Sequence, residues 1–198
     1  TLAQTSYIRN YFQKLASSAQ SGNYSLSNGY PVYIDIPSFI HYIIIAELSS
    51  NADSYGLSTY FHKDRNGKLR AGPIWDSDLT FGNDLFLWGY DRSHTDVWQF
   101  HDYGNDGSKF WYDLFLNSQF RCYLSKRWNE LTQPGQPLDL ATLYFYIDQT
   151  VDLIGEAVER DYVRWSAGRI SHTQRIAALK AWLAERIPWI TANLGSFS

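Results

Sequence analysis

The chain has 198 residues, of which 44% are hydrophobic and 19% charged, so it is long enough for one domain with a substantial core and too apolar to be disordered. Its formal charge of -3 and its pI near 5.9 give no electrostatic basis for binding nucleic acid or an anionic membrane. We therefore expect a single domain over residues 1–198 with no polyanion partner.

No segment of the sequence has the composition of a membrane span. The most apolar stretch, Phe39 to Leu48, covers only about ten residues and includes His41 and Glu47, which favours a core helix. Cys122 is the single cysteine, so the chain forms no intrachain disulfide. The sequence has no methionine and no signal segment, so we expect a processed chain or an excised part of a longer protein.

The N-terminal part is predicted to contain two helices joined by a loop. Apolar residues between positions 5 and 20 recur on one helical face, and a loop rich in Ser, Gly and Asn follows over residues 21–29. Residues 32–35 are expected to form a short extended piece. The next helix should run from about Pro37 to Ser49, with Pro37 in its first turn. Because this helix is apolar nearly all round, it should be central, and Glu47 on it requires a partner, for which we expect an ion pair.

A polar loop over residues 49–56 leads into the clearest hairpin signal of the sequence, residues 58–75. Residues 58–63 are rich in aromatic and β-branched types, and residues 68–75 run extended again. Between them, Asp64 to Gly67 has the composition of a turn in which Gly67 is free to take positive φ. We therefore predict a β-hairpin whose second strand ends at Asp76 and Asp78.

Asp76 and Asp78 are two carboxylates one residue apart at a strand end. Mg²⁺ takes oxygen ligands and usually keeps room for water and a substrate phosphate, so the pair is a candidate site for this cation. The alternative is that both side chains cap the following turn, as Asp commonly does. Asn51 and Asp53, in the loop before the hairpin, also allow two interpretations: helix capping with turn formation, or a catalytic loop on a rigid scaffold.

The rest of the chain is predicted to be one irregular segment followed by helices. Residues 83–108 hold many Gly, Asp and Asn residues, and a long segment of this kind is uncommon unless it borders a functional site. Helical spacing covers residues 110–131, a long helix is expected from 139 to 165, and a last helix from 171 to 193 should kink at Pro188. The expected fold class is α+β and mostly helical, with a long central helix, one β-hairpin and C-terminal helices.

Several reaction classes have no motif in the sequence. There is no Gly-x-Ser-x-Gly elbow, no metalloprotease His-Glu pair and no zinc-type cysteine spacing. There is also no Walker motif and no kinase Gly-x-Gly-x-x-Gly loop to hold phosphates.

The hairpin and the segments on either side of it resemble the signature of the CotH kinase family, the spore-coat-protein-H-like atypical protein kinases of bacteria. The upstream run from Phe39 to Tyr55, with Glu47, Asn51 and Asp53, is similar to the segment that precedes this signature, and weaker similarity extends over residues 30–194. The signature itself consists of Tyr60-Phe61-His62-Lys63-Asp64, Gly67-Lys68-Leu69, Gly72-Pro73-Ile74-Trp75-Asp76-Ser77-Asp78 and Phe81-Gly82.

This resemblance implies the C-terminal lobe of a kinase-like fold and the transfer of phosphate from ATP to Ser or Thr hydroxyls of a protein substrate, with Mg²⁺ as cofactor. It places the catalytic aspartate on Asp53 and the metal-binding aspartate on Asp76. Asp78 would assist at the metal, and Asn51 would assist in binding the cofactor. The resemblance also implies secretion to the cell surface or the extracellular space.

Two features depart from the family pattern. The nucleotide-binding lobe, with its phosphate-contacting lysine, would precede residue 1, and Ser77 stands where the family often has an aromatic residue. We therefore expect the 198-residue chain to fold by itself but to transfer phosphate only together with the upstream lobe.

Two alternatives stay open. The first is an inactive kinase-like domain that serves as a binding module. The second is a carbohydrate-binding or surface-attachment module, suggested by an aromatic content of 17%, although most of these aromatic residues are expected in the core.

Overall fold

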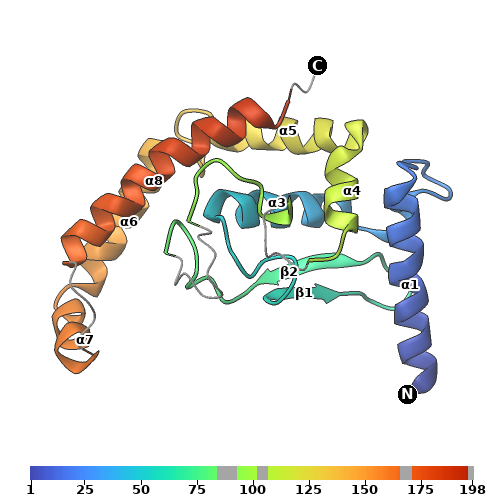
Figure 1. Ribbon diagram of the computed structural model, residues 1–198, viewed down its shortest axis with the longest axis horizontal. Coiled ribbons are helices and arrows are strands. Elements are labelled where there is room, and N and C mark those ends of the chain that lie inside the picture. The colour runs from blue at the N-terminus through green and yellow to red at the C-terminus, as the bar shows by residue number, and fades with distance from the viewer. Residues whose placement is uncertain (84–92, 102–106, 166–170, 196–198) are drawn as a thin grey trace.

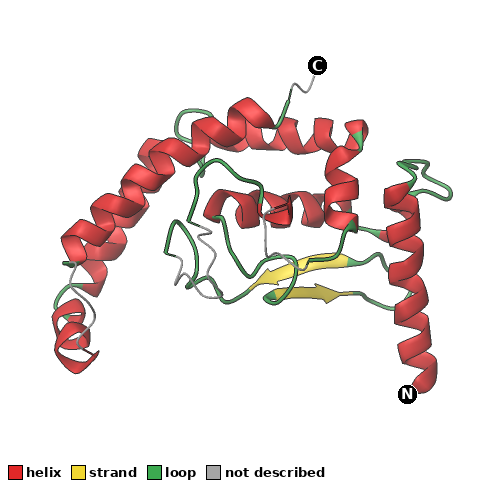
Figure 2. Ribbon diagram, in the orientation of Figure 1, coloured by secondary structure: helices red, strands yellow, loops and turns green. Residues whose placement is uncertain are grey.

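The computed structural model describes residues 1–83, 93–101, 107–165 and 171–195 of the chain. Within these ranges it contains eight α-helices and one two-stranded antiparallel sheet, which confirms the mostly helical α+β fold (Figure 1, Figure 2). None of the described helices is both long and apolar enough to cross a membrane. Much of the segment that we expect to be irregular, residues 84–92 and 102–106, lies outside the described residues.

Helix α1 (Leu2–Gln20) confirms the first predicted helix but begins a few residues earlier, because Thr1 caps it. The Thr1 hydroxyl accepts a hydrogen bond from the Gln4 main-chain N–H at 3.3 Å, and the Gln4 side chain accepts one from the Thr1 amino group at 2.8 Å. Phe12 of this helix packs on Phe61 of the hairpin, with ring centroids 5.3 Å apart. The helix therefore lies along one edge of the core (Figure 1).

The prediction of an extended piece at residues 32–35 is wrong for its first half. Residues Tyr30–Tyr33 form the short helix α2, which has Pro31 in its first turn. The fixed φ of proline suits the first turn of a helix. Ile34 and Asp35 are extended, and Ile34 forms an isolated parallel bridge with Leu69, next to the hairpin.

Helix α3 (Ile36–Ser49) begins where the sequence predicts it. Asp35 caps the helix by accepting from the Ser38 main-chain N–H at 3.0 Å, and Pro37 occupies the first turn. These start signals fix the beginning of the helix locally, without help from the rest of the fold.

Strands β1 (Thr59–His62) and β2 (Arg70–Ile74) form the predicted antiparallel hairpin. Its turn is closed by the Gly67 N–H, which donates to the Asp64 carbonyl at 3.0 Å. The residue with positive φ is Asn66, at 63°, so the prediction that Gly67 takes this conformation is wrong. Asn tolerates the left-handed region because its short side chain can hydrogen-bond locally.

The predicted helical region 110–131 consists of two helices, α4 (Phe110–Leu116) and α5 (Ser118–Thr132). They are separated at Asn117, which has extended backbone angles and whose side chain accepts from the Phe120 N–H at 3.0 Å. An Asn at this position stops one helix and starts the next, because its side chain supplies the acceptor that the first turn of α5 lacks.

The prediction of one long helix over residues 139–165 is wrong. The segment forms α6 (Leu140–Ile154) and α7 (Ala157–Trp165), because Gly155 takes φ 45° and ψ -125° and ends the first helix. Helix α8 (His172–Asn193) confirms the last predicted helix and contains Pro188. Figure 1 shows α6 and α8 running side by side away from the hairpin, with α7 at the far end.

The core is built around α3, which lies between the hairpin and the helices α5 and α8 (Figure 1). Trp111 of α4 is 1% exposed and joins the two sides of this core. Its ring lies 4.9 Å from Phe39, 5.1 Å from Tyr42 and 5.8 Å from Phe61 between centroids. The loop that follows α3 is therefore attached to the centre of the core.

Candidate functional site

The loop that carries Asn51 and Asp53 starts at the C-terminus of α3. Ser50 takes a left-handed conformation with φ 48°, its N–H donates to the Glu47 carbonyl at 3.2 Å, and the Asn51 N–H donates to the Ala46 carbonyl at 3.1 Å. This pair of bonds is the usual way to end a helix with a left-handed residue. It turns the chain out of α3, so that the loop with Asn51 and Asp53 leaves the helix axis.

The segment after β2 lies against this loop. The Phe81 N–H donates to the Ser49 carbonyl at 2.6 Å, and the Ala52 N–H donates to the Leu79 carbonyl at 3.3 Å. These two backbone bonds join segments that are separated by the whole hairpin. The hairpin therefore brings the stretch with Asp76 and Asp78 back to the loop with Asn51 and Asp53.

Asn51 connects the two candidate aspartates directly. Its Oδ1 accepts from the Asp53 main-chain N–H at 3.0 Å, and its Nδ2 donates to the main-chain carbonyl of Asp76 at 3.4 Å. Asn51 is itself only 5% exposed, and both bonds are partly buried. Asn51 therefore completes the helix end and the turn, as the capping interpretation expects, and its side chain also holds the segment of Asp76.

Ser58 is a second connection between the aspartates, and the sequence analysis missed it. The Ser58 N–H donates to the Asp53 carbonyl at 3.0 Å, and its hydroxyl donates to Oδ2 of Asp76 at 3.5 Å. The available signal is the hairpin register, because Thr59 pairs with Ile74 and the preceding Ser58 must then face the residues just after β2.

Asp78 lies two residues beyond Asp76 on the same loop, and both are exposed. The main-chain carbonyl of Asp78 accepts from Nδ2 of Asn83 at 2.7 Å, which orders the loop. Among the described residues, no group of three or more His, Cys, Asp or Glu side chains is arranged to hold a metal ion. The atoms that gather here and could coordinate a cation are carboxylate, amide and hydroxyl oxygens. Such ligands suit a hard cation that keeps several of its water molecules.

Backbone strain also gathers at these two loops. In the described part of the chain, five residues other than glycine have positive φ, and all except Asn66 lie at the site: Ser50 at 48°, Tyr55 at 69°, Asp76 at 57° and Phe81 at 54°. A left-handed conformation is unfavourable for residues with a Cβ and persists only where the surroundings enforce it. Such residues occur preferentially at functional sites, so the strain supports the location of the site independently of its acids.

A small hollow lies next to the aspartates, between α3 and the end of β2. Its lining combines hydroxyl and amide side chains with aliphatic and aromatic ones. The lining residues are Ser49, Asn51, Ser54, Ser58 and Ser77 together with Tyr42, Ile45, Ala46, Ile74 and Trp75.

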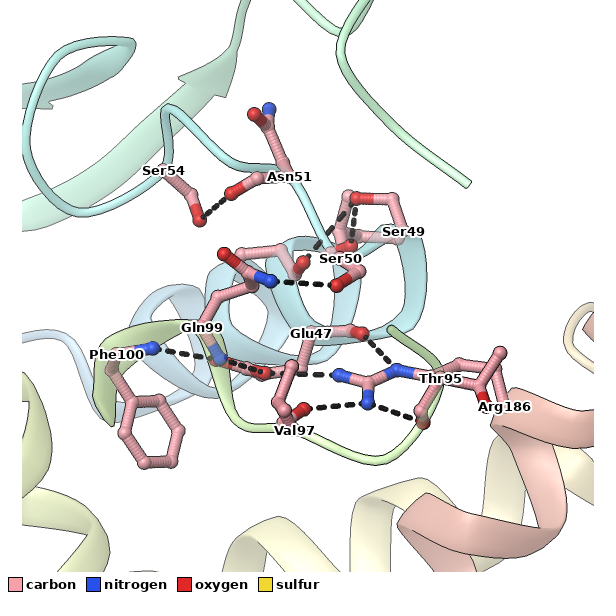
Figure 3. A network of polar contacts seen from close by, with 12 residues as sticks. Glu47, Ser49, Ser50, Asn51, Ser54, Thr95, Val97, Gln99, Phe100 and Arg186 are labelled. Carbon is pink, nitrogen blue, oxygen red and sulfur yellow. Dashed lines mark hydrogen bonds and ion pairs between the residues drawn. The ribbon is translucent and has the colours of Figure 1, made fainter. Parts of the chain in front are cut away.

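Behind the loop lies the buried ion pair that the sequence predicts for Glu47. Its partner is Arg186 of α8, whose Nη2 lies 3.2 Å from Oε2 of Glu47, and the two side chains are 0% and 2% exposed. Figure 3 shows the Arg186 guanidinium enclosed by Glu47 and by the main-chain carbonyls of Thr95 and Val97, which accept from Nη1 at 2.8 and 2.6 Å. Four of the five donors of the guanidinium group are thus used, since Nε donates to the Glu47 carbonyl at 2.9 Å.

Burial is the main electrostatic influence on this pair. It raises the pKa of Glu47 and lowers the pKa of Arg186, because the interior disfavours both charges, while their mutual attraction opposes both shifts. The sequence analysis did not identify Arg186. The signal is its place on the apolar stripe of α8, three residues after Leu183 and four before Ile190, where an arginine requires a buried partner.

Comparison with known proteins adds one result to this geometry. A family model described as CotH kinase protein matches residues 2–190, which is nearly the whole chain. Searches for similar curated proteins and for similar solved structures found no match.

Proposed function

Because the chain belongs to the CotH kinase family, we propose that it carries the catalytic and metal-binding part of a protein kinase that transfers phosphate from ATP to Ser or Thr hydroxyls of a protein substrate. The observation that carries the proposal is the double hydrogen bonding of Asn51. It ties the Asp53 N–H and the Asp76 carbonyl into one cluster at the surface.

The acids would have different roles in this reaction. Asp53, half-buried on the loop after α3, would accept or orient the proton of the acceptor hydroxyl. Asp76 would be the principal ligand of Mg²⁺, with Asp78 and Asn51 as helpers. Bound together with ATP, Mg²⁺ would supply positive charge at the phosphate oxygens.

The neighbouring groups support these roles by holding the two aspartates at fixed positions. The Ser58 hydroxyl donates to Asp76 and thereby orients its carboxylate, while the Ser58 N–H holds the Asp53 carbonyl. Phosphoryl transfer depends more on positioning than on reactive groups. Two loops that several hydrogen bonds hold together in a fixed conformation therefore suit this chemistry.

The first test compares two substitutions in the natural full-length protein. Asp76→Ala should abolish Mg²⁺-dependent nucleotide binding. Asp53→Ala should leave that binding largely intact and lower turnover by about 10²-fold or more, the usual contribution of general acid–base catalysis. Calorimetry with Mg-ATP and incorporation of labelled phosphate measure the two effects.

The matched control is Asp152→Ala, which removes an exposed carboxylate from α6, far from the site in the chain. It should change neither binding nor turnover. Phosphate transfer at the normal rate by both Asp53→Ala and Asp76→Ala would refute the assignment. Sugar binding without any metal-dependent nucleotide binding would favour the carbohydrate-binding alternative instead.

Localisation outside the cell or at its surface is also part of this proposal. The check is fractionation of cells that produce the natural protein, followed by detection of the chain in the medium or on intact cells. Its exclusive recovery from the cell interior would contradict the proposal.

A further inference from the structure

We propose that Glu47 is a positioning residue for the phosphoryl transfer, because it fastens both ends of the loop at residues 50–55 that carries Asn51 and Asp53. The catalytic meaning of this inference rests on the proposed function. Its structural part rests on a buried polar network, most of which Figure 3 shows.

The first end of the loop is held through Gln99, which belongs to the short 3-10 helix η2 (Gln99–His101). The Gln99 main-chain N–H donates to Oε2 of Glu47 at 2.9 Å, and its side-chain Nε2 donates to the hydroxyl of Ser50 at 2.8 Å. Gln99 is 0% exposed and Ser50 is 3% exposed, so water does not compete for these bonds. Glu47 therefore fixes Gln99, and Gln99 fixes the residue at which the chain turns out of α3.

The second end of the loop is held directly. The Tyr55 hydroxyl donates to Oε1 of Glu47 at 2.8 Å, and the ring of Tyr55 packs on Trp111 with centroids 5.2 Å apart. Tyr55 is 4% exposed. A hydrogen bond to a buried carboxylate is among the stronger ones in proteins, so the position of Tyr55 relative to α3 is narrowly defined.

The two fastened residues are also the two strained residues of the loop. Ser50 and Tyr55 both have positive φ, which side chains with a Cβ avoid unless other contacts enforce it. Glu47 supplies contacts of this kind at both positions. Without them, the loop could relax toward ordinary backbone angles, and Asn51 would then move away from the Asp76 carbonyl.

Arg186 makes the arrangement possible, because a carboxylate buried to this extent requires a counter-charge. Its guanidinium group also accepts no hydrogen bonds, so it cannot compete for the donors that Glu47 uses on Tyr55 and Gln99. The clamp thus consists of Glu47 with four attachments: Arg186 for its charge, Gln99 toward Ser50, the Phe100 main-chain N–H, which donates to Oε1 at 3.3 Å, and Tyr55.

The decisive experiment cuts one attachment and leaves the ion pair intact. Tyr55→Phe removes only the hydroxyl on Glu47. Its matched control is Tyr30→Phe, which removes a hydroxyl from a tyrosine that is 1% exposed and donates to Oδ1 of Asn117 at 3.2 Å, away from the site. Both variants lose one buried hydrogen bond, but only the first frees an end of the loop.

Two measurements on the full chain separate the variants. Hydrogen exchange should be about tenfold faster at the Ala52 and Ser58 amides in Tyr55→Phe, the factor expected for losing one hydrogen bond to a charged group. Mn²⁺, which accepts the same oxygen ligands as Mg²⁺, should bind several-fold more weakly, as followed by its paramagnetic resonance signal. Tyr30→Phe should change neither quantity.

Gln99→Leu provides a second variant, because it frees the Ser50 end and keeps the main-chain bond to Glu47. It should reproduce both effects. Unchanged exchange and unchanged Mn²⁺ affinity in Tyr55→Phe and Gln99→Leu would overturn the clamp. If the unmodified chain binds no Mn²⁺, the catalytic meaning of the clamp fails together with the proposed metal site, whereas faster loop exchange in the variants would still support its mechanical part.

Discussion

At the scale of single residues, Asn51 holds the end of a helix, a turn and a segment beyond the hairpin. Its main-chain N–H closes the end of α3, its Oδ1 forms the turn to Asp53, and its Nδ2 reaches the Asp76 carbonyl. An aspartate here could accept from the Asp53 N–H but could not donate to a carbonyl, whereas an amide does both. This difference gives a physical reason for an Asn at a position surrounded by acids.

The pKa values of the buried tyrosines predict how the stability of the protein depends on pH. Burial raises the pKa of Tyr30 to about 12, chiefly because the interior disfavours the phenolate, and it also raises the pKa of Tyr42 and Tyr55. Above pH 10 the unfolded chain releases the Tyr30 proton and the folded chain does not. The stability is therefore complete below pH 10 and falls as the pH rises from 10 to 12, by up to about 1.4 kcal/mol per pH unit for this residue.

Urea unfolding at several pH values between 9 and 12 measures this decline. In Tyr30→Phe the unfolding free energy should fall less steeply with pH, by up to about 1.4 kcal/mol per pH unit, which corresponds to one proton. The variant should also be less stable at pH 7, because Asn117 loses its hydrogen-bond partner. Equal slopes for the two chains would show that Tyr30 ionises alike in the folded and unfolded states.

At the scale of elements, the segment after β2 depends on α8 for its position. Phe81 packs edge-on against Trp182 with centroids 5.8 Å apart, and a Cβ on the next residue, Gly82, would lie 2.7 Å from Cδ1 of Trp182. Gly82 also has φ 80°, which disfavours other residues. The Phe81-Gly82 pair of the family signature therefore serves as a close contact between the site segment and the C-terminal helix.

Because of this contact, Gly82→Ala should destabilise the protein more than a Gly→Ala change at a position where only the backbone conformation is unfavourable. Gly135→Ala is the matched control, since Gly135 has nearly the same φ, 78°, but no atom within 4 Å of the added Cβ. The control should lose about 1 kcal/mol from the left-handed conformation. Gly82→Ala should lose that amount and about 1–3 kcal/mol more from overpacking against Trp182.

Urea unfolding with tryptophan fluorescence compares the two variants, and only Gly82→Ala should shift the fluorescence of the folded chain. Similar losses in both would mean that Trp182 moves aside freely and that the contact does not hold the segment.

At the scale of the whole molecule, Arg186 joins parts of the chain that are far apart in the sequence. It links α8 to the C-terminal end of α3 and to the main-chain carbonyls of Thr95 and Val97, and three indole rings surround it, those of Trp98, Trp182 and Trp189. The helical arm formed by α6 and α8 is thus fastened to the core directly behind the candidate site (Figure 1). The stability of the core and the geometry of the site depend on the same ion pair.

Arg186→Met should therefore destabilise the protein by about 3–5 kcal/mol, because it leaves the Glu47 carboxylate buried without a counter-charge. The matched control is Arg160→Met on α7, whose ion pair with Glu156 at 2.6 Å is exposed and should contribute at most about 1 kcal/mol. Chemical denaturation of the three chains measures the difference. A loss in Arg186→Met as small as in Arg160→Met would show that Glu47 is protonated or hydrated in the folded state and does not require the arginine.

The sequence by itself determined the features that neighbouring residues encode. Apolar periodicity located α1 and α8, the apolar run with Pro37 in its first turn located α3, and turn composition located the hairpin with Asp76 at its end. These elements form through contacts a few residues apart. The family resemblance rests on that same local stretch. Local signals also failed where two residues could serve equally well, as at the turn, where Asn66 and not Gly67 takes positive φ.

Only the tertiary structure decided which distant groups meet. The partner of Glu47 lies 139 residues away in Arg186, and the link from Ser58 to Asp76 depends on the register of the hairpin. A buried charge signals that a partner must exist, but its identity follows from how the helices pack, which no short window of sequence contains. For the same reason the acids of the candidate site were visible in the sequence, whereas Ser58 and Arg186, which help to hold them in place, were not.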